Sequence, residues 1–175
     1  GLPPIEFYDR RDFAWVAGLE ASADAIREEA EQVLRDRSRL RPYVEDDDGP
    51  QVASVKIAGS RDWTAFFLCR SGSIVEENAR LCPRTMAALE GVPLAWAEGA
   101  TPSILFSVLE PGAHIPPHNG MVNTRLICHL PVITPAGCTL RVGAEHRDWR
   151  QGETLIFDDS IEHEAWKRGS ATRVV

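Results

Sequence analysis

No hydrophobic stretch of this sequence approaches the about 20 apolar residues that a helix needs to cross a bilayer, so we expect no membrane span. An excess of positive charge is also missing: 19 Lys and Arg stand against 26 Asp and Glu, and the formal net charge is −7. This balance argues against a nucleic-acid or anionic-lipid partner, although a local basic pocket could still bind a small anion. The four cysteines lack CxxC spacing and no signal-peptide pattern opens the chain, so we expect buried, reduced thiols in a cytoplasmic protein.

The chain is long enough for one domain with a hydrophobic core, since it has 175 residues of which 43% are hydrophobic and 26% charged. Residues 101–175 contain short β-rich segments separated by Pro and Gly, a pattern typical of an all-β sandwich or barrel. Residues 1–100 are then predicted to support this β core with helices and a strand. We predict the core strands at residues 103–109, 126–132, 139–142, 154–157, 163–166 and 172–175.

The first part of the chain carries two helix patterns and one strand pattern. Apolar residues recur at helical spacing over residues 19–34, which predicts an amphipathic helix whose charged residues, among them Glu29, face solvent. Residues 63–70 are rich in β-formers and predict a strand, while residues 83–90 begin with proline and are followed by glycine, which predicts a second helix. Residues 41–51 are acidic but lack calcium-loop spacing, so we interpret them as a surface loop.

Histidines lie on or beside the predicted strands. Residues 104–109 and 126–132 read as two strands joined near His118, with His114 on the same strand face as His118. The two prolines between these histidines forbid a helix, which excludes the paired-histidine motif of helical zinc proteases. His163 follows His118 by 45 residues and is the best partner for a site that would hold iron, zinc or copper. The alternative is that each is a structural histidine held by hydrogen bonds.

A basic residue near the end of the sequence offers an anion site. Arg173 follows His163 by ten residues, on a predicted strand after a glycine turn. Its guanidinium can bind a carboxylate bidentately inside a pocket, and a buried arginine needs an anion. Ser107 precedes His118 by eleven residues and could add a hydroxyl to the same carboxylate.

Two longer motifs make the sequence recognisable. The segments PPHNGMVNTRLICHL and WRQGETLIFDDSIEHEAW, followed by the strand that carries Arg173, resemble the aspartyl/asparaginyl β-hydroxylase family of iron(II)- and 2-oxoglutarate-dependent dioxygenases. The resemblance covers roughly the last two thirds of the chain. It implies a mainly β fold with flanking helices and a double-stranded β-helix core, the jelly-roll shared with cupins. It also implies that His118 and His163 bind iron, and that Arg173 and Ser107 bind the distal carboxylate of 2-oxoglutarate.

One position departs from the wider dioxygenase superfamily. The usual facial triad has a carboxylate two residues after its first histidine, where this chain has Gly120. The β-hydroxylase family shares this absence, which implies iron held by two histidines, 2-oxoglutarate and water. Asp158 and Asp159 are the nearest alternative carboxylates, and we interpret them as supports of the ligands or as turn-formers instead of direct ligands.

The resemblance also suggests which residues meet the substrate. Arg125 is expected to bind a carboxylate of the substrate or the C1 carboxylate of 2-oxoglutarate, with a surface salt bridge as the alternative. Ile127 stands where relatives with peptide substrates can carry a second arginine, and His129, on the same strand face, is expected to hydrogen-bond 2-oxoglutarate. Trp63 and Trp166 match the walls of the family's pocket, although core packing is the alternative for both.

The activity implied by the resemblance is hydroxylation of the β-carbon of an aspartyl or asparaginyl residue, or of a related small acidic substrate. One alternative is a cupin-like metal enzyme that uses no 2-oxoglutarate, against which Arg173 argues. Another is a non-enzymatic β-roll that binds an anion, and a third is a halogenase, which would require chloride for product formation.

Overall fold

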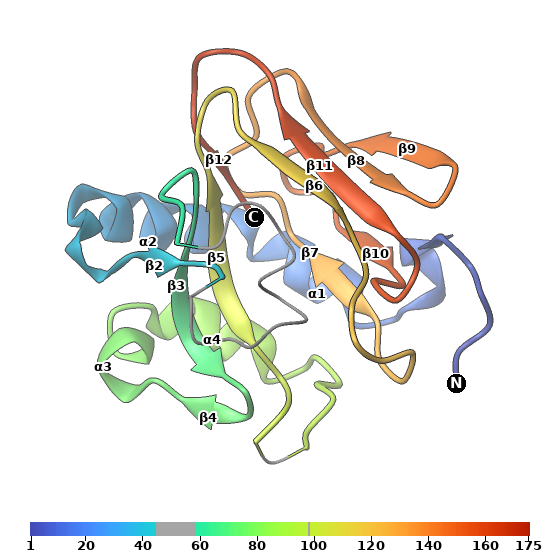
Figure 1. Cartoon of the computed structure of the whole chain (residues 1–175). Helices are drawn as coiled ribbons and strands as arrows, with labels where there is room; N and C mark the ends of the chain where they lie inside the picture. The colour runs from blue at the N-terminus through green and yellow to red at the C-terminus, as the bar shows by residue number, and fades with distance from the viewer. Residues whose placement is uncertain (45–58, 98) are drawn as a thin grey trace.

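The computed structural model describes residues 1–44, 59–97 and 99–175 (Figure 1). The acidic run at residues 45–48, interpreted above as part of a surface loop, lies outside the described residues. Strands dominate the second half of the chain and helices lie to one side of them. The predicted fold class, mainly β with flanking helices and a jelly-roll core, is confirmed by the arrangement of the sheets and by the solved structure compared below.

Three antiparallel sheets build the roll, and each contains strands that are distant in sequence. The first has the order β1 (Phe7–Tyr8), β10 (Leu155–Phe157) and β7 (Ile127–His129). The second has the order β6 (His114–His118), β11 (His163–Lys167), β8 (Cys138–Val142) and β9 (Glu145–Asp148). The third has the order β12 (Arg173–Val174), β5 (Ile104–Leu109), β3 (Trp63–Arg70) and β2 (Arg41–Pro42), with β4 (Ser73–Ile74) paired to β3.

The predicted strands lie where the sequence placed them, but two of them are not connected to each other as predicted. Each of the six predicted core segments contains a strand, yet residues 104–109 and 126–132 are not two strands joined near His118. They form β5 and β7 in different sheets, and β6 lies between them in sequence as part of the remaining sheet. β7 is also shorter than predicted, because Pro131 has no N–H to continue the ladder.

Four α-helices accompany the sheets in the described part of the chain: α1 (Val16–Ala21), α2 (Ala23–Arg35), α3 (Glu76–Ala79) and α4 (Pro83–Leu89). Two short 3-10 helices lie at Arg10–Asp12 and Arg37–Arg39. The single helix predicted over residues 19–34 is interrupted at Ser22, whose hydroxyl donates to the carbonyl of Gly18 at 3.1 Å. Such a bond from a serine side chain to the preceding turn bends or interrupts helices. The helix predicted at residues 83–90 is present as α4.

Alternation along the third sheet separates two hydrophobic cores. Phe106 and Val108 of β5 pack with buried residues of α2 on the helix side of the sheet. Leu109 belongs instead to the core inside the roll, together with residues of all three sheets. Ser107 lies on this interior face because side chains two apart on a strand point the same way. The third sheet therefore presents an apolar face to the helices, whereas its face toward the interior of the roll also carries polar groups.

Glu29 corrects the prediction that the charges of the long helix face solvent. It is only 3% exposed, and its carboxylate accepts hydrogen bonds from the backbone N–H of Arg84 at 2.9 Å and from the backbone N–H and hydroxyl of Thr85 at 2.8 and 2.6 Å. These backbone donors belong to the first turn of α4, where no intrahelical acceptor exists. Glu29 thus joins α2 to α4.

Replacing Glu29 with alanine should lower the free energy of unfolding by about 2–3 kcal/mol, because it leaves buried donors of α4 unpaired. Burial raises the pKa of Glu29, but the hydrogen bonds from Thr85 and Arg84 outweigh it and hold the pKa below 4.5. The stabilisation is therefore complete above pH 4.5 and is lost as pH falls through the lower folded-state pKa. Urea unfolding at several pH values measures both effects, with the exposed Glu31→Ala as control.

No helix in the described ranges is long and apolar enough to cross a membrane.

All four cysteines are free. Cys69, Cys82 and Cys138 are buried as expected, whereas Cys128 is exposed. Burial of the last was wrongly predicted because β7 is an edge strand of its sheet, and Cys128 alternates with the residues that face the roll.

Candidate active site

The register between β6 and β11 brings two histidines of distant sequence position together. His163 is the antiparallel partner of His118, and the centres of their rings lie 4.1 Å apart. Nδ1 of His118 lies 2.8 Å from the carbonyl oxygen of Pro116, and Nδ1 of His163 lies 3.0 Å from that of Ile161. A carbonyl only accepts, so each Nδ1 carries the proton and each Nε2 keeps its lone pair. This tautomer leaves Nε2 able to bind a metal, while the Nδ1–H bond to the backbone holds the ring in place.

Burial also favours the metal-binding form of His163. The pKa of His163 is lowered to about 4, first by burial and then by the neighbouring His118. His163 is therefore neutral at physiological pH, as a ligand must be. Among the residues that the structure describes, no group of three or more His, Cys, Asp or Glu is arranged to hold a metal ion. The two histidines are thus a pair and, within the described residues, not part of a larger protein cage.

His114 does not share the strand face of His118, contrary to the sequence prediction. The register shifts between the pair His163 and His118 and the pair Ala165 and Ile115. β6 therefore has one more residue than β11 over this stretch, which is a β-bulge. Pro116 and Pro117 lie in this bulge, where a residue without an N–H is tolerated. His114 consequently points outward, stacks on Trp166 with ring centres 5.4 Å apart, and contacts the Glu164 carboxylate at 3.1 Å.

Asp159 occupies the space beside Gly120 that a side chain at position 120 would need. The backbone N–H of Gly120 donates to the carbonyl of Asp159 at 2.6 Å, and a Cβ on Gly120 would lie 2.4–2.8 Å from the Asp159 carboxylate atoms. The same carboxylate pairs with both terminal nitrogens of Arg125 at 3.2–3.3 Å. Burial raises the pKa of Asp159, and Arg125 opposes this rise. The Asp159 carboxylate therefore approaches position 120, where the usual facial triad has its carboxylate, but Asp159 comes from the segment after β10.

Replacing Gly120 with aspartate should not create a facial triad. The new Cβ would collide with Asp159, and two buried carboxylates would compete for Arg125, so we expect the free energy of unfolding to fall by about 1–3 kcal/mol. Binding of iron(II), the metal that the family resemblance implies, should weaken and not strengthen. The double variant Gly120→Asp with Asp159→Gly removes the collision and should recover most of the stability. Urea unfolding and anaerobic iron titration distinguish the two variants, and tighter iron binding by the single variant would contradict this expectation.

Asp158 forms the turn that precedes His163. It is fully buried, and its two oxygens accept hydrogen bonds from the backbone N–H of Ser160 at 2.9 Å and from the Asn123 side chain at 2.7 Å. Both oxygens are therefore already engaged. The Asn123 contact ties this turn to the loop that contains Arg125, so it holds the two segments flanking the histidine pair.

Arg173 is a buried cation without an anionic partner. It is 1% exposed in the interior of the roll, and Nη2 donates to Ser107 Oγ at 3.0 Å. The same hydroxyl oxygen accepts from Trp63 Nε1, also at 3.0 Å. Nε of Arg173 has no hydrogen-bond partner, and no described carboxylate pairs with it. Burial lowers the pKa of Arg173 to about 10, which leaves it charged at neutral pH. A buried guanidinium with an unpartnered N–H can accommodate an anion.

The two tryptophans named from the sequence lie in different places. Trp63 is buried at the start of β3, stacks on Tyr43 with ring centres 3.8 Å apart, and lies 6.2 Å from the His118 ring. It therefore forms a wall beside the histidine pair. Trp166 stacks between His114 and His146 on the outer face of the second sheet, so neither the pocket wall nor the core was a correct prediction for it. Strand alternation puts it opposite to Ala165.

His129 lies on β7 with its ring 4.9 Å from that of Phe157, which in turn contacts the His163 ring at 5.8 Å. The pKa of His129 is lowered to about 3 by burial and, secondarily, by Arg173 and His163, so the ring is neutral. Its Nδ1 accepts a hydrogen bond from Trp149 Nε1 at 3.2 Å. Sequence reasoning gave Trp149 no role, although it is the first residue of the second motif. Ile127 is partly buried against the interior core.

Comparison with known proteins decides the family. The family model described as Aspartyl/Asparaginyl beta-hydroxylase matches residues 20–175. The chain belongs to this family. The resemblance stated from its motifs is thereby confirmed, and the match extends well upstream of them into the helical part of the chain.

Relatives of this aspartyl/asparaginyl β-hydroxylase family member differ in what their names describe. An ornithine lipid ester-linked acyl 2-hydroxylase of Rhizobium tropici is 39% identical over 178 residues, covering 100% of this chain and 59% of the relative. The human aspartate beta-hydroxylase domain-containing protein 2 is 39% identical over 70% of this chain and 33% of its own length. The mouse aspartyl/asparaginyl beta-hydroxylase is 34% identical over 91% of this chain and 20% of its own. The chain thus spans only part of these relatives.

A solved structure supports the fold of this family member. A prolyl-4-hydroxylase of Pseudomonas putida superposes with a TM-score of 0.51 at 16% identity, covering 91% of this chain and 94% of the other. At this identity the likeness concerns the fold alone.

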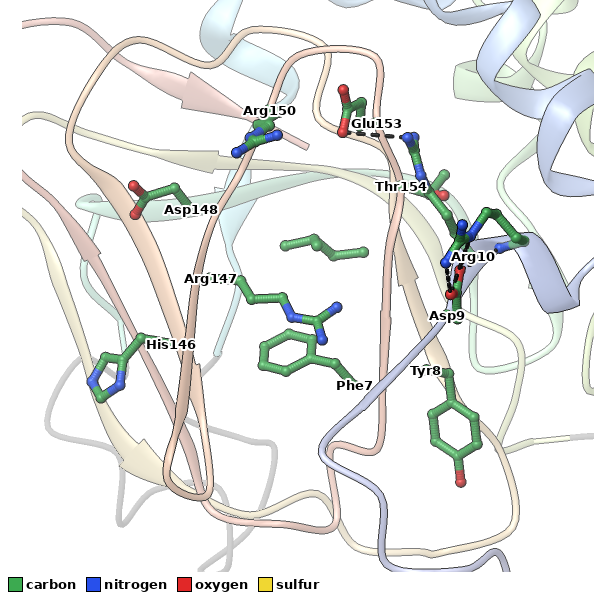
Figure 2. Close-up of a pocket in the computed structure, with 12 residues that line it drawn as sticks. Phe7, Tyr8, Asp9, Arg10, His146, Arg147, Asp148, Arg150, Glu153 and Thr154 are labelled. Carbon is green, nitrogen blue, oxygen red and sulfur yellow. Dashed lines mark hydrogen bonds and ion pairs between the residues drawn. The ribbon is translucent and has the colours of Figure 1, made fainter.

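A separate pocket of about 730 Å³ lies between β1, β9 and β10 (Figure 2). None of the site residues predicted from the sequence lies on its wall. Arg147 stacks over the Phe7 ring with 4.4 Å between guanidinium carbon and ring centre. Two other arginines of this pocket are paired with carboxylates: Arg10 with Glu20 and Glu153, and Arg11 with Asp9. Its charges largely neutralise one another.

Proposed function

We propose that this chain is an iron(II)- and 2-oxoglutarate-dependent hydroxylase. The observation that carries the proposal is Arg173: a buried guanidinium without an anion, in the same roll as two adjacent histidines whose Nδ1 atoms both face backbone carbonyls. An apolar core gains nothing from an unpaired buried charge, so the charge points to a ligand that brings a carboxylate. 2-Oxoglutarate has one carboxylate for the arginine and a keto acid for the metal.

Each residue then has a specific task. Nε2 of His118 and Nε2 of His163 would bind iron, while Arg173 and the Ser107 hydroxyl would bind the distal carboxylate of 2-oxoglutarate. His129 would donate a hydrogen bond to the cosubstrate, and Trp63, which contacts Ser107 and lies beside His118, would cover one side of the site and exclude water. Bound iron with 2-oxoglutarate and oxygen supplies the chemistry that gives succinate, carbon dioxide and a hydroxylated product. The protein's contribution is to decide which C–H bond lies beside the metal.

The Arg125–Asp159 pair lies next to Gly120 and bears on substrate choice. We propose an aspartyl or asparaginyl residue, or a related small acidic molecule, hydroxylated at its β-carbon, with Arg125 available to share its charge between Asp159 and a substrate carboxylate. The mouse relative named as an aspartyl/asparaginyl beta-hydroxylase supports this reading.

A second candidate substrate is an acyl chain. The Rhizobium tropici relative, whose match covers the whole of this chain, is named as an acyl 2-hydroxylase. Ile127 is apolar, the charge of Arg125 is balanced by Asp159, and Met121 and Val122, just after Gly120, are 77% and 43% exposed. These apolar side chains suit a hydrocarbon better than an acidic peptide.

Four free cysteines fit a reducing compartment, and we propose a cytoplasmic location.

Succinate formation by anaerobically iron-loaded protein on admitting oxygen tests the proposal. The protein is offered 2-oxoglutarate with aspartyl and asparaginyl peptides, free acidic amino acids or acyl amides and esters, and products are identified by mass spectrometry. We expect substrate-stimulated succinate that is lost in Arg173→Ala. Stimulation by acyl compounds alone selects the second candidate. A protein that binds iron but neither binds nor consumes 2-oxoglutarate would overturn the proposal in favour of a cupin-like enzyme.

A further inference from the structure

Trp149 opens the second family motif, yet the proposed chemistry assigns it nothing. It follows β9 directly and is buried, and its backbone N–H donates to the carbonyl of Cys138 at 3.2 Å. Its indole contacts two residues of the candidate site. Nε1 donates to Nδ1 of His129 at 3.2 Å, and the guanidinium carbon of Arg173 lies 4.6 Å from the centre of the ring.

The hydrogen bond from Trp149 determines which nitrogen of His129 carries the proton. An indole N–H only donates, so Nδ1 must present a lone pair to it. A neutral imidazole has one ring proton, which must then be on Nε2. Within the described ranges, Nε2 of His129 makes no hydrogen bond of its own. The ring is therefore left with one unused donor.

The direction of that donor matters for an anionic ligand. An Nε2–H attracts a carboxylate oxygen, whereas the other tautomer would turn a lone pair toward it. The face of the same indole supports the guanidinium of Arg173 by a cation–π contact, which is worth more in a buried site than at the surface. One side chain thus orients two positive or proton-donating groups toward the interior of the roll.

We propose that Trp149 is a positioning residue for the dicarboxylate cosubstrate: it fixes the Nε2–H tautomer of His129 through Nε1 and supports Arg173 through its ring face. The inference rests on the proposed function, because it takes 2-oxoglutarate as the ligand. Trp149 itself does not touch the reacting atoms.

The first test needs no cosubstrate and no substitution. The ¹⁵N shifts and two-bond couplings of ¹⁵N-histidine-labelled, metal-free protein identify the protonated nitrogen of each ring, with His129→Gln to assign the signal. We expect a pure Nε2–H tautomer for His129. A proton on Nδ1 would overturn the inference, and this result would leave the proposed function standing.

The second test uses Trp149→Phe, which keeps an aromatic ring under Arg173 but removes the N–H donor. Titration of iron-loaded protein with 2-oxoglutarate under anaerobic conditions should give a Kd raised about 10-fold or more, with the Kd for iron changed less than about twofold. The matched control is Trp166→Phe on the outer face, which should bind 2-oxoglutarate as the parent does. An unchanged Kd in a folded Trp149→Phe protein would contradict the inference.

A double-mutant cycle separates positioning from a general structural effect. Glutamine at position 129 has an amide that can donate without a tautomer, so Trp149→Phe should change the Kd for 2-oxoglutarate by less than about threefold in the His129→Gln background. An equal loss in both backgrounds would show that Trp149 does not act through His129. If Trp149→Phe fails to fold, the tautomer measured in the parent protein still decides. If the parent itself does not bind 2-oxoglutarate, the proposed function fails independently of that tautomer.

Discussion

Replacing either His118 or His163 with alanine is expected to abolish stable iron binding, with an affinity for iron(II) lowered by more than about 100-fold. The site has only two histidine nitrogens to offer, and the described residues contain no third ligand that could compensate. Removing one ring leaves a single protein ligand. Anaerobic titration, followed by metal analysis after desalting, measures the loss.

His114→Ala is the matched control for this experiment. It removes a histidine from the same strand, four residues from His118, but one that faces outward against Trp166 and Glu164. Its iron affinity should equal that of the parent protein. Equal losses in His114→Ala and His118→Ala, or retention of iron by His118→Ala, would mean that the pair on β6 and β11 is not the metal site.

Replacing Arg173 with methionine is expected to abolish 2-oxoglutarate binding without destabilising the ligand-free protein. The Kd for 2-oxoglutarate should rise roughly 100-fold or more, because the distal carboxylate loses a charge-assisted bidentate partner in a buried site. The free energy of unfolding should stay the same or rise by about 1–2 kcal/mol, because an unpaired buried charge is replaced by an apolar side chain of similar length. Most substitutions of a fully buried side chain lower the free energy of unfolding, so loss of 2-oxoglutarate binding without such a loss of stability would be distinctive.

The pH dependence follows from the same burial. The folded-state pKa of Arg173, about 10, is depressed below its ordinary value of 12.5, so the charged side chain opposes folding at neutral pH and this penalty is relieved as pH rises through the folded-state pKa. A bound carboxylate relieves it at neutral pH, so 2-oxoglutarate should raise the Tm of the parent protein but not of Arg173→Met.

Arg141→Met serves as the control for this pair of measurements. Arg141 lies on the outer side of the second sheet, where it pairs with Glu162 and Glu164. Its loss should leave 2-oxoglutarate binding and the ligand-induced rise in Tm unchanged. Tight 2-oxoglutarate binding by Arg173→Met would remove the main support for the proposed cosubstrate.

Much of the fold followed from local patterns that tertiary contacts did not override. Proline at the first turn and glycine beyond the end predicted α4, and β-formers between turn residues predicted the positions of the core strands. The division of the long helix at Ser22 and the burial of Glu29 did not follow. Both depend on specific partners, a carbonyl one turn back and the first turn of a different helix, which periodicity does not contain.

The sequence by itself determined the family and its fold, because contiguous motifs carry the histidines, the glycine and the terminal arginine in a fixed order. Only the tertiary structure decided which of those residues act together. The bulge at Pro116 and Pro117 turns His114 outward, and the carboxylate of Asp159 fills the space next to Gly120. Trp149 meets His129 and Arg173 although 20 and 24 residues separate them in sequence. Strand register and packing between sheets bring such groups together, and neither is encoded in any single local segment.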